Sequence, residues 1–151
     1  MEVIIIGAGL AGSEAALQLA KRNIKVKLYE MRPEKTTGAH VTENCAEFVC
    51  SNSLGSADIT NASGLLKAEM QELGGELIKV AYECRVPAGN ALAIDRVGFS
   101  KKVTELIESN ENIELIREEL KEIPSDKPVI IASGPLTSDD LANKIQEFTK
   151  S

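Results

Sequence analysis

A β-branched run followed at once by a glycine-rich turn constrains this chain more than any other feature. Residues 3–6 read Val-Ile-Ile-Ile, the pattern of a strand buried on both faces, as in a parallel sheet. Residues 7–12 read Gly-Ala-Gly-Leu-Ala-Gly, and helical spacing of Ala and Leu follows over residues 13–22. Alternating apolar residues over 25–30 indicate a second strand. These pieces predict a βαβ unit of about 30 residues.

The three glycines have the spacing of a dinucleotide-binding turn. Gly7 permits the tight turn, Gly9 lets a pyrophosphate approach the backbone, and Gly12 lets the helix pack closely on the sheet. The helix N-terminus supplies donors and the positive end of its dipole. Glu30 closes the second strand, where it can bind both ribose hydroxyls of an adenosine, and an acidic residue there favours FAD or NAD over NADP. The cofactor-binding residues predicted in this unit are Gly7, Ala8, Gly9, Leu10, Ala11, Gly12 and Glu30.

The remainder of the chain continues an α/β pattern after a long interruption. Residues 31–62 lack periodicity and carry turn chemistry, and a loop of this length is usually functional. Further elements are expected as helices over 63–73, 95–109 and 138–148, and as strands over 113–116, 119–123 and 128–132. The sequence thus predicts a Rossmann-like α/β fold with a central parallel sheet, in which residues 1–151 form one dinucleotide-binding domain.

Two short segments favour flavin over nicotinamide. The apolar strand predicted over 128–132 ends in Ser133-Gly134 and resembles the second signature of flavoproteins with two dinucleotide-binding domains, which ends Ala-Thr-Gly. Asp95-Arg96 resembles the Asp-Arg motif that starts a helix in such flavoproteins, although Asp95 can also be a simple N-cap. We therefore expect these four residues to contact FAD.

Three segments carry a more specific resemblance. Residues 7–16, Tyr29-Glu-Met-Arg-Pro33 and Ala46-Glu-Phe-Val-Cys-Ser-Asn-Ser53 are similar to the folate- and FAD-dependent tRNA (uracil-5-)-methyltransferases, and residues 86–96 and 134–137 continue the similarity. The resemblance adds Arg32 to the expected FAD contacts. Members of that family are much longer, so the resemblance implies a truncated chain, the N-terminal part of the FAD domain, with no activity when isolated.

The family resemblance also implies a reaction. Its members methylate C5 of a uridine in the tRNA T-loop; methylenetetrahydrofolate supplies the carbon, and FAD reduced by NAD(P)H supplies the electrons. Cys50 matches the family cysteine that adds to C6 of uracil. The chemistry needs a thiolate because C5 is a poor nucleophile until addition at C6 creates an enolate. Partners implied are tRNA and the folate, without a stable protein partner.

The residues alone are compatible with two other functions. The chain could belong to a flavin oxidoreductase or a wobble-uridine-modifying flavoprotein of the same superfamily, from which residues 46–53 distinguish it. It could also be a nucleotide-binding module that catalyses nothing on its own.

Composition and cysteine spacing exclude several classes. With 17 basic and 23 acidic side chains the net charge is −6, which excludes a generally basic nucleic-acid binder. No apolar run approaches the roughly 20 residues that span a bilayer, and no signal-type start is present, so we expect a cytoplasmic protein. His40, Cys45, Cys50 and Cys84 match no closed zinc pattern, so no metal site is predicted. We expect Cys45 and Cys84 to pack in the interior and His40 to be a solvated loop residue.

Overall fold

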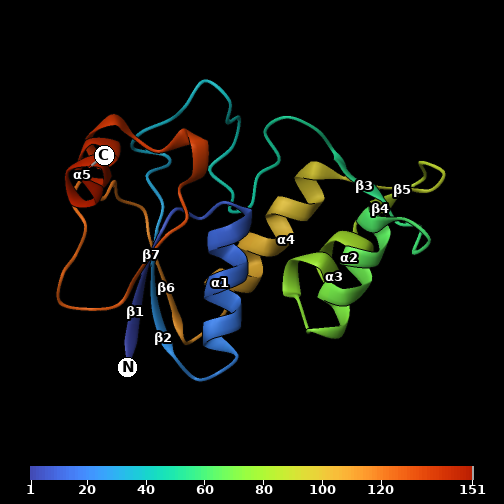
Figure 1. Cartoon of the computed structure of the whole chain (residues 1–151), viewed down its shortest axis with the longest axis horizontal. Helices are drawn as coiled ribbons and strands as arrows, with labels where there is room; N and C mark the ends of the chain where they lie inside the picture. The colour runs from blue at the N-terminus through green and yellow to red at the C-terminus, as the bar shows by residue number, and fades with distance from the viewer. Residues whose placement is uncertain (151) are drawn as a thin grey trace.

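The computed structural model describes residues 1–150 and arranges them around two β-sheets (Figure 1). The larger sheet is parallel, in the order β6-β2-β1-β7, from β1 (Glu2–Ile6), β2 (Lys25–Tyr29), β6 (Ile113–Ile116) and β7 (Val129–Ile131). The smaller is antiparallel, in the order β3-β5-β4, from β3 (Ser53–Ser56), β5 (Ala91–Ile94) and β4 (Arg85–Val86). The helices are α1 (Leu10–Ala20), α2 (Ala62–Glu72), α3 (Glu76–Glu83), α4 (Arg96–Glu108) and α5 (Asp139–Thr149), with a 3-10 turn at Gly134–Leu136. Among these residues, no helix is long and apolar enough to cross a membrane.

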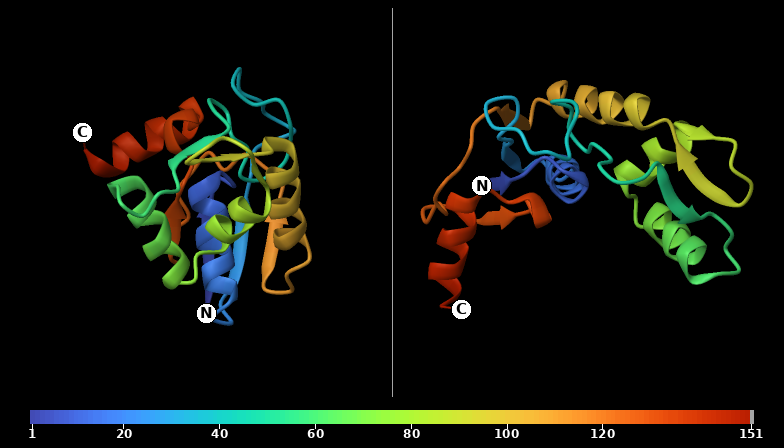
Figure 2. Two further views of the ribbon diagram at one scale, coloured as in Figure 1. Left: turned by 90° about the vertical axis from the view of Figure 1, so that its right-hand side faces the viewer. Right: turned by 90° about the horizontal axis from the view of Figure 1, so that it is seen from above.

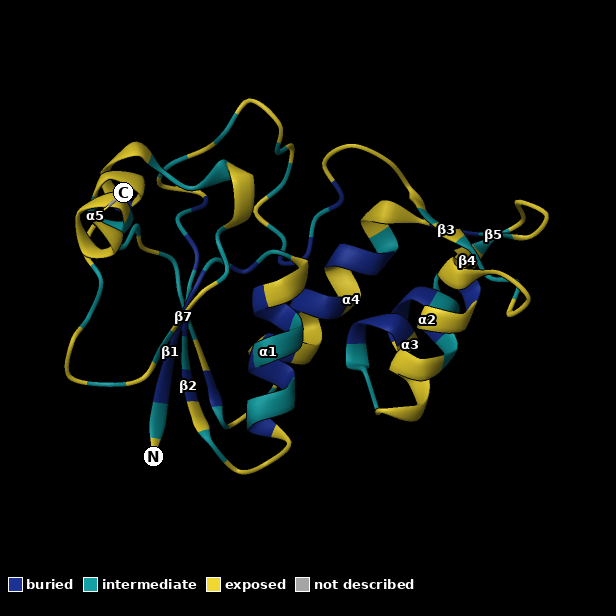
Figure 3. Ribbon diagram, viewed as in Figure 1, coloured by how far each residue is buried: buried dark blue, intermediate teal, exposed yellow. Residues whose placement is uncertain are grey.

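Strand β1 is buried on both faces and forms the centre of the parallel sheet, as its sequence predicts (Figure 3). Val3 and Ile5 belong to the main core, which includes residues of α1, α3 and α4. Ile4 and Ile6 face the other way and pack against Leu141 of α5. The alternation follows from the two-residue repeat of a strand, and it places helices on both sides of the sheet (Figure 2). The predicted parallel α/β fold is therefore confirmed.

Two predictions for the end of the chain are wrong. The run over 128–132 is not a buried strand: β7 is an edge strand that pairs only with β1, and Ile130 and Ile131 are 37% and 40% exposed. Residues 119–123 form no strand, and Leu120 and Ile123 instead pack against the small core under α5 from an irregular segment. A short apolar run is compatible with a buried strand, an edge strand or a packed irregular segment, and its sequence does not distinguish them.

The antiparallel sheet was not predicted, because its strands are only two to four residues long and β3 is largely polar. Residues 53–56 lie inside the segment expected to be irregular, yet they pair with β5. Helix α3 was also missed. Helix α2 lies close to its predicted range, but its apolar residues Leu65 and Leu66 are exposed, whereas Gly64 and Lys67 are buried. In α4, Phe99, Val103 and Ile107 are buried as expected, but Leu106 is exposed.

Steric contacts explain two glycines of the turn between β1 and α1. Gly7 has φ +99°, and a Cβ on it would lie 2.8 Å from the Cα of Ser133 at the end of β7. A Cβ on Gly12 would lie only 1.8 Å from the carbonyl oxygen of Gly7, so the turn and the first helical turn touch through backbone atoms. Gly9 differs, since no atom lies within 4 Å of its Cβ position. Two glycines are thus required by the fold itself, and the third is not.

We expect Gly12→Ala to destabilise the protein by about 3 kcal/mol or more, because the methyl group would overlap rigid backbone. Gly9→Ala serves as the control: Gly9 has φ −71°, which any residue adopts, and its surroundings are open. This control should change stability by less than about 1 kcal/mol. Urea unfolding followed by circular dichroism measures both. Equal stability of the Gly12→Ala and wild-type proteins would contradict the close contact.

Candidate functional site

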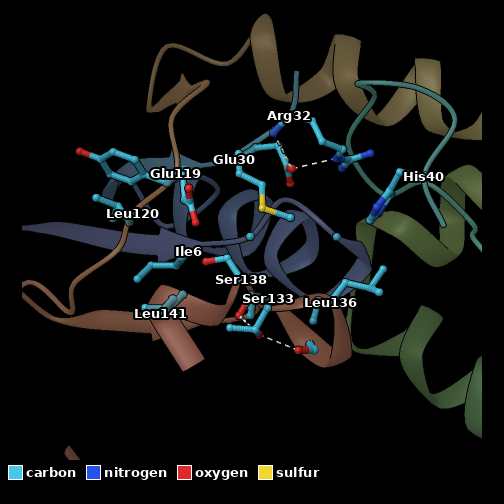
Figure 4. A pocket seen from close by; sticks show the side chains of 18 of the residues that line it. Ile6, Glu30, Arg32, His40, Glu119, Leu120, Ser133, Leu136, Ser138 and Leu141 are labelled. Atoms are coloured by element: carbon cyan, nitrogen blue, oxygen red, sulfur yellow. Dashed lines mark hydrogen bonds and ion pairs between the residues drawn. The ribbon is translucent and has the colours of Figure 1, made fainter. Parts of the chain in front are cut away.

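A cavity of about 300 Å³ opens where β1, β2 and β7 end (Figure 4). Strand β1 has β2 on one side and β7 on the other, so the cavity lies at the point where the order of the strands reverses. Ligands of open α/β sheets bind at such a point, beyond the carboxyl ends of the strands. Its lining includes most of the residues predicted to bind the cofactor: Gly7, Gly9, Leu10, Ala11, Glu30, Arg32, Ser133 and Gly134.

The glycine turn presents its backbone to this cavity. Gly9 is the N-cap of α1 and has no side chain to cap the first turn. The first-turn N–H groups of a helix have no partners within the helix, so they suit an anionic group. Because the space around Gly9 is open, a pyrophosphate can reach them. Ala8, also predicted as a cofactor contact, is fully buried behind the turn.

Glu30 holds the turn as well as facing the cavity. Its Oε2 accepts the backbone N–H of Ala8 at 3.0 Å. Its Oε1 accepts both the backbone N–H of Arg32 at 3.1 Å and Nε of Arg32 at 2.8 Å. A carboxylate has about four acceptor positions, and three are therefore in use. One ribose hydroxyl can bind directly; binding both, as the sequence suggested, requires Glu30 to release one of these donors.

Ionisation of Glu30 is favoured by its neighbour. Burial opposes the charged form, but the hydrogen bonds and positive charge of Arg32 outweigh it and hold the pKa of Glu30 below its ordinary value. Arg32 itself is only 2% exposed and also pairs with Glu47, at 3.0 Å between Nη1 and Oε2. The same Nη1 donates to the carbonyl of Thr42 at 3.0 Å. Arg32 thus lines the cavity while its Nε and Nη1 donate to protein groups, and its contact with a cofactor stays a prediction.

Glu47 and His40 reach the cavity from the loop that follows β2. Glu47 had no predicted role, and the expectation that His40 is a solvated loop residue is wrong, because it is half-buried in the cavity lining. Glu47 accepts the backbone N–H groups of Val41 and Thr42 at 2.9 and 3.1 Å. Burial opposes its charge, but these bonds and Arg32 lower the pKa of Glu47. His40 is half-buried beside Thr37, and burial together with Arg32 lowers its pKa. Glu47 lies within the motif of residues 46–53, but nothing in that motif indicates its pairing with Arg32, which only the fold reveals.

Cys50 is exposed and lies on the same loop, just outside the cavity. Its neighbour Val49 lines the cavity. The loop is held to the glycine turn by the backbone N–H of Ala46, which donates to the carbonyl of Ala8 at 2.8 Å. Phe48 packs edge-to-face on Phe99 of α4, with ring centroids 5.2 Å apart. An accessible thiol is therefore presented next to the candidate cofactor cavity by a loop that is anchored at several points.

Asp95 and Arg96 lie at the start of α4 and do not line the cavity in the described part of the chain. The Asp95 carboxylate accepts the backbone N–H of Val97 at 3.1 Å, which confirms the N-cap role. Arg96 donates to the carbonyl of Phe48 at 3.5 Å, so it contacts the loop that carries Cys50. Their role as cofactor contacts remains a prediction.

The other two cysteines are interior residues. Cys45 is buried in the main core and Cys84 packs partly buried against it, which confirms their expected packing roles. Burial raises the pKa of both thiols, which disfavours the thiolate form at these two positions. Within residues 1–150, no group of three or more His, Cys, Asp or Glu side chains is arranged to hold a metal ion.

Comparison with known proteins agrees with this geometry. The chain is 63% identical over 148 residues to the methylenetetrahydrofolate–tRNA-(uracil-5-)-methyltransferase TrmFO of Fusobacterium nucleatum, covering 98% of this chain and 34% of that protein. It is 61% identical over 147 residues to TrmFO of Aquifex aeolicus, covering 97% of this chain and 33% of that protein. The chain thus spans about a third of the length of these relatives.

A crystal structure of Aquifex aeolicus GidA matches with a TM-score of 0.63 and 22% identity, over 83% of this chain and 21% of that one, a likeness of fold. The family model for glucose inhibited division protein A matches residues 2–150. The resemblance that the motifs suggested is therefore confirmed, and the chain belongs to the glucose inhibited division protein A family.

Proposed function

We propose that this chain is the cofactor-binding and nucleophile-bearing part of a folate- and FAD-dependent tRNA (uracil-5-)-methyltransferase. One observation carries the proposal: the turn suited to a pyrophosphate is hydrogen-bonded, from Ala8 to Ala46, to the loop that presents Cys50. A cofactor site and an exposed thiol are thereby held side by side. The relatives named TrmFO support the same reaction.

The turn and Glu30 fit the adenosine diphosphate half of FAD. The first-turn N–H groups of α1 would bind the pyrophosphate, and the free acceptor position of Glu30 would bind a ribose hydroxyl. Ser133 and Gly134, at the end of β7, would face the cofactor from the opposite wall. When bound and reduced by NAD(P)H, FAD would supply the electrons that bring the folate's one-carbon unit to the methyl level.

Cys50 would activate the uracil. Its thiolate adds to C6, the C5–C6 double bond opens, and the electron pair is held as an enolate that makes C5 nucleophilic. After C5 has received the one-carbon unit, loss of the C5 proton restores the double bond and expels the thiolate. The exposure of Cys50 suits this role because a tRNA base must reach the sulfur from solvent.

The tests use a chimera in which the 148 matching residues of this chain replace the corresponding third of the Fusobacterium nucleatum relative, which supplies the rest of the chain. Bound flavin without methyl transfer or covalent trapping in this chimera would favour the alternative of a nucleotide-binding module. Flavin together with a different redox activity would favour another flavoprotein of the superfamily.

Gly9→Val should lower the flavin content of the chimera about tenfold or more, because a side chain would occupy the path of the pyrophosphate. Gly38→Val is the matched control, since the Cβ position of Gly38 is equally open but lies outside the cavity. Absorbance of the purified proteins near 450 nm measures bound flavin. Normal flavin content in Gly9→Val would show that the pyrophosphate does not bind at this turn.

Cys50→Ala should leave flavin bound, because Cys50 does not line the cavity, but should abolish methylation and covalent trapping on tRNA that contains 5-fluorouridine. Fluorine at C5 cannot leave as a proton does, so the adduct persists and is visible on a denaturing gel. Cys84→Ala and Cys45→Ala should still form the adduct, with modest losses of stability from small cavities. Adduct formation by Cys50→Ala would remove Cys50 from the mechanism.

A further inference from the structure

Three charged side chains connect the cavity to the loop that carries Cys50. Glu30 pairs with Arg32 at 2.8 Å, and Arg32 pairs with Glu47 at 3.0 Å. One end of this carboxylate–guanidinium chain, Glu30–Arg32–Glu47, accepts the backbone N–H of Ala8 in the glycine turn. The other end accepts two backbone N–H groups and a hydroxyl from Val41 and Thr42. The ribose end of the cavity and the loop are therefore parts of one hydrogen-bonded unit.

Burial makes this unit sensitive to any change at either end. Arg32 is fully buried, and the exposed fractions of the Glu30 and Glu47 side chains are 7% and 10%. Breaking a buried ion pair from one side leaves the other charge unpaired in a medium of low polarity, which is costly. A ligand that binds Glu30 weakens or displaces its pair with Arg32. The strength and geometry of the pair between Arg32 and Glu47 must then change as well. Glu47 is three residues from Cys50, and the intervening Val49 lines the cavity.

We infer that Glu47 is a positioning residue that couples occupation of the ribose end of the cavity to the placement of Cys50. The inference rests on the proposed function in taking an adenosine diphosphate group as the ligand and Cys50 as the reacting group. Coupling of this kind is reciprocal: a nucleotide that alters the loop must bind differently when the loop is altered. Glu47 would act through the loop, because its hydrogen bonds go to Arg32, Val41 and Thr42.

Glu47→Gln isolates this role because it preserves shape while removing one acceptor. Oε1 of Glu47 accepts from Val41, and Oε2 accepts from Thr42 and Arg32, so both oxygens face donors. A glutamine must turn its NH₂ group toward one of these sets of donors. In either orientation the substitution removes the charge that pairs with Arg32 and breaks one set of hydrogen bonds at the loop end, while the pair of Glu30 with Arg32 stays in place.

Glu14 offers a matched control elsewhere in the fold. It is a half-buried carboxylate on α1, and both of its oxygens also accept hydrogen bonds. Its partners include the backbone N–H groups of Glu76 and Leu77 at the start of α3, at 2.9 and 2.7 Å. Glu14→Gln thus breaks a comparable set of bonds that does not reach Cys50.

The experiment measures alkylation of Cys50 by iodoacetamide in the 151-residue protein, with and without saturating ADP, by mass spectrometry of the Cys50 peptide. We expect ADP to change the rate by about fivefold or more in the wild-type and Glu14→Gln proteins, and by less than about twofold in Glu47→Gln. Hydrogen exchange of residues 41–50 should accelerate in Glu47→Gln only, and that of residues 76–83 in Glu14→Gln only. A purely structural role for Glu47 would lower stability without removing the effect of ADP.

The remaining outcomes also test the inference. An undiminished effect of ADP in Glu47→Gln, or ADP binding to wild type without any effect at Cys50, would overturn it. If ADP does not bind wild type, the proposed cofactor site and the coupling both fail, whereas ADP binding without an effect at Cys50 overturns the coupling and leaves the cofactor site standing. If Glu47→Gln does not fold, Glu47→Asp replaces it. It keeps both oxygens on a shorter stem and should give a smaller ADP effect than wild type, and an equal effect would count against the inference.

Discussion

The structure depends on the way the backbone of Ala8 is held within the turn between β1 and α1. Its N–H donates to Glu30 at the end of β2, and its carbonyl accepts from the backbone of Ala46 and the hydroxyl of Ser13. Each of these partners comes from a different segment of the chain. Because unsatisfied buried backbone groups are costly, these bonds fix the turn relative to the sheet, the helix and the loop. The same bonds leave the neighbouring N–H groups of α1 directed toward the cavity.

The loop after β2 connects the two sheets, and it also connects the glycine turn at the cavity with Cys50. It contacts the glycine turn through Ala46, and it reaches the antiparallel sheet where the backbone N–H of Ile94 donates to the carbonyl of Asn52 at 2.9 Å. Arg96 and Phe99 of α4 hold the segment between these points, through the carbonyl and ring of Phe48. A loop usually has few such anchors, and these explain how an exposed cysteine can keep a defined position beside the cavity.

Buried charge is concentrated where the cavity meets this loop. Glu30, Arg32 and Glu47 satisfy one another, and among residues 1–150 no buried side-chain polar atom lacks a partner. Such a network contributes little net stability compared with apolar packing, but it specifies geometry because each member accepts few alternative arrangements. The charged groups are therefore better understood as a means of positioning the turn and the loop than as a source of stability.

The sequence by itself determined the parallel α/β core and the cofactor turn, because β1 and the glycine spacing depend on local rules of strand burial and backbone sterics. Motif similarity in residues 46–53 also identified the family and singled out Cys50 as the candidate nucleophile. Only the tertiary structure revealed the contacts of Glu47 and the pairing of the antiparallel sheet, because both depend on segments that are separated in the chain. The outcome for β7 has the same cause: Val129–Ile131 are apolar enough for a buried strand, but burial depends on what packs beside them. Local pattern specifies which element a segment can form, whereas hydrogen bonds and packing across the fold decide what that element touches.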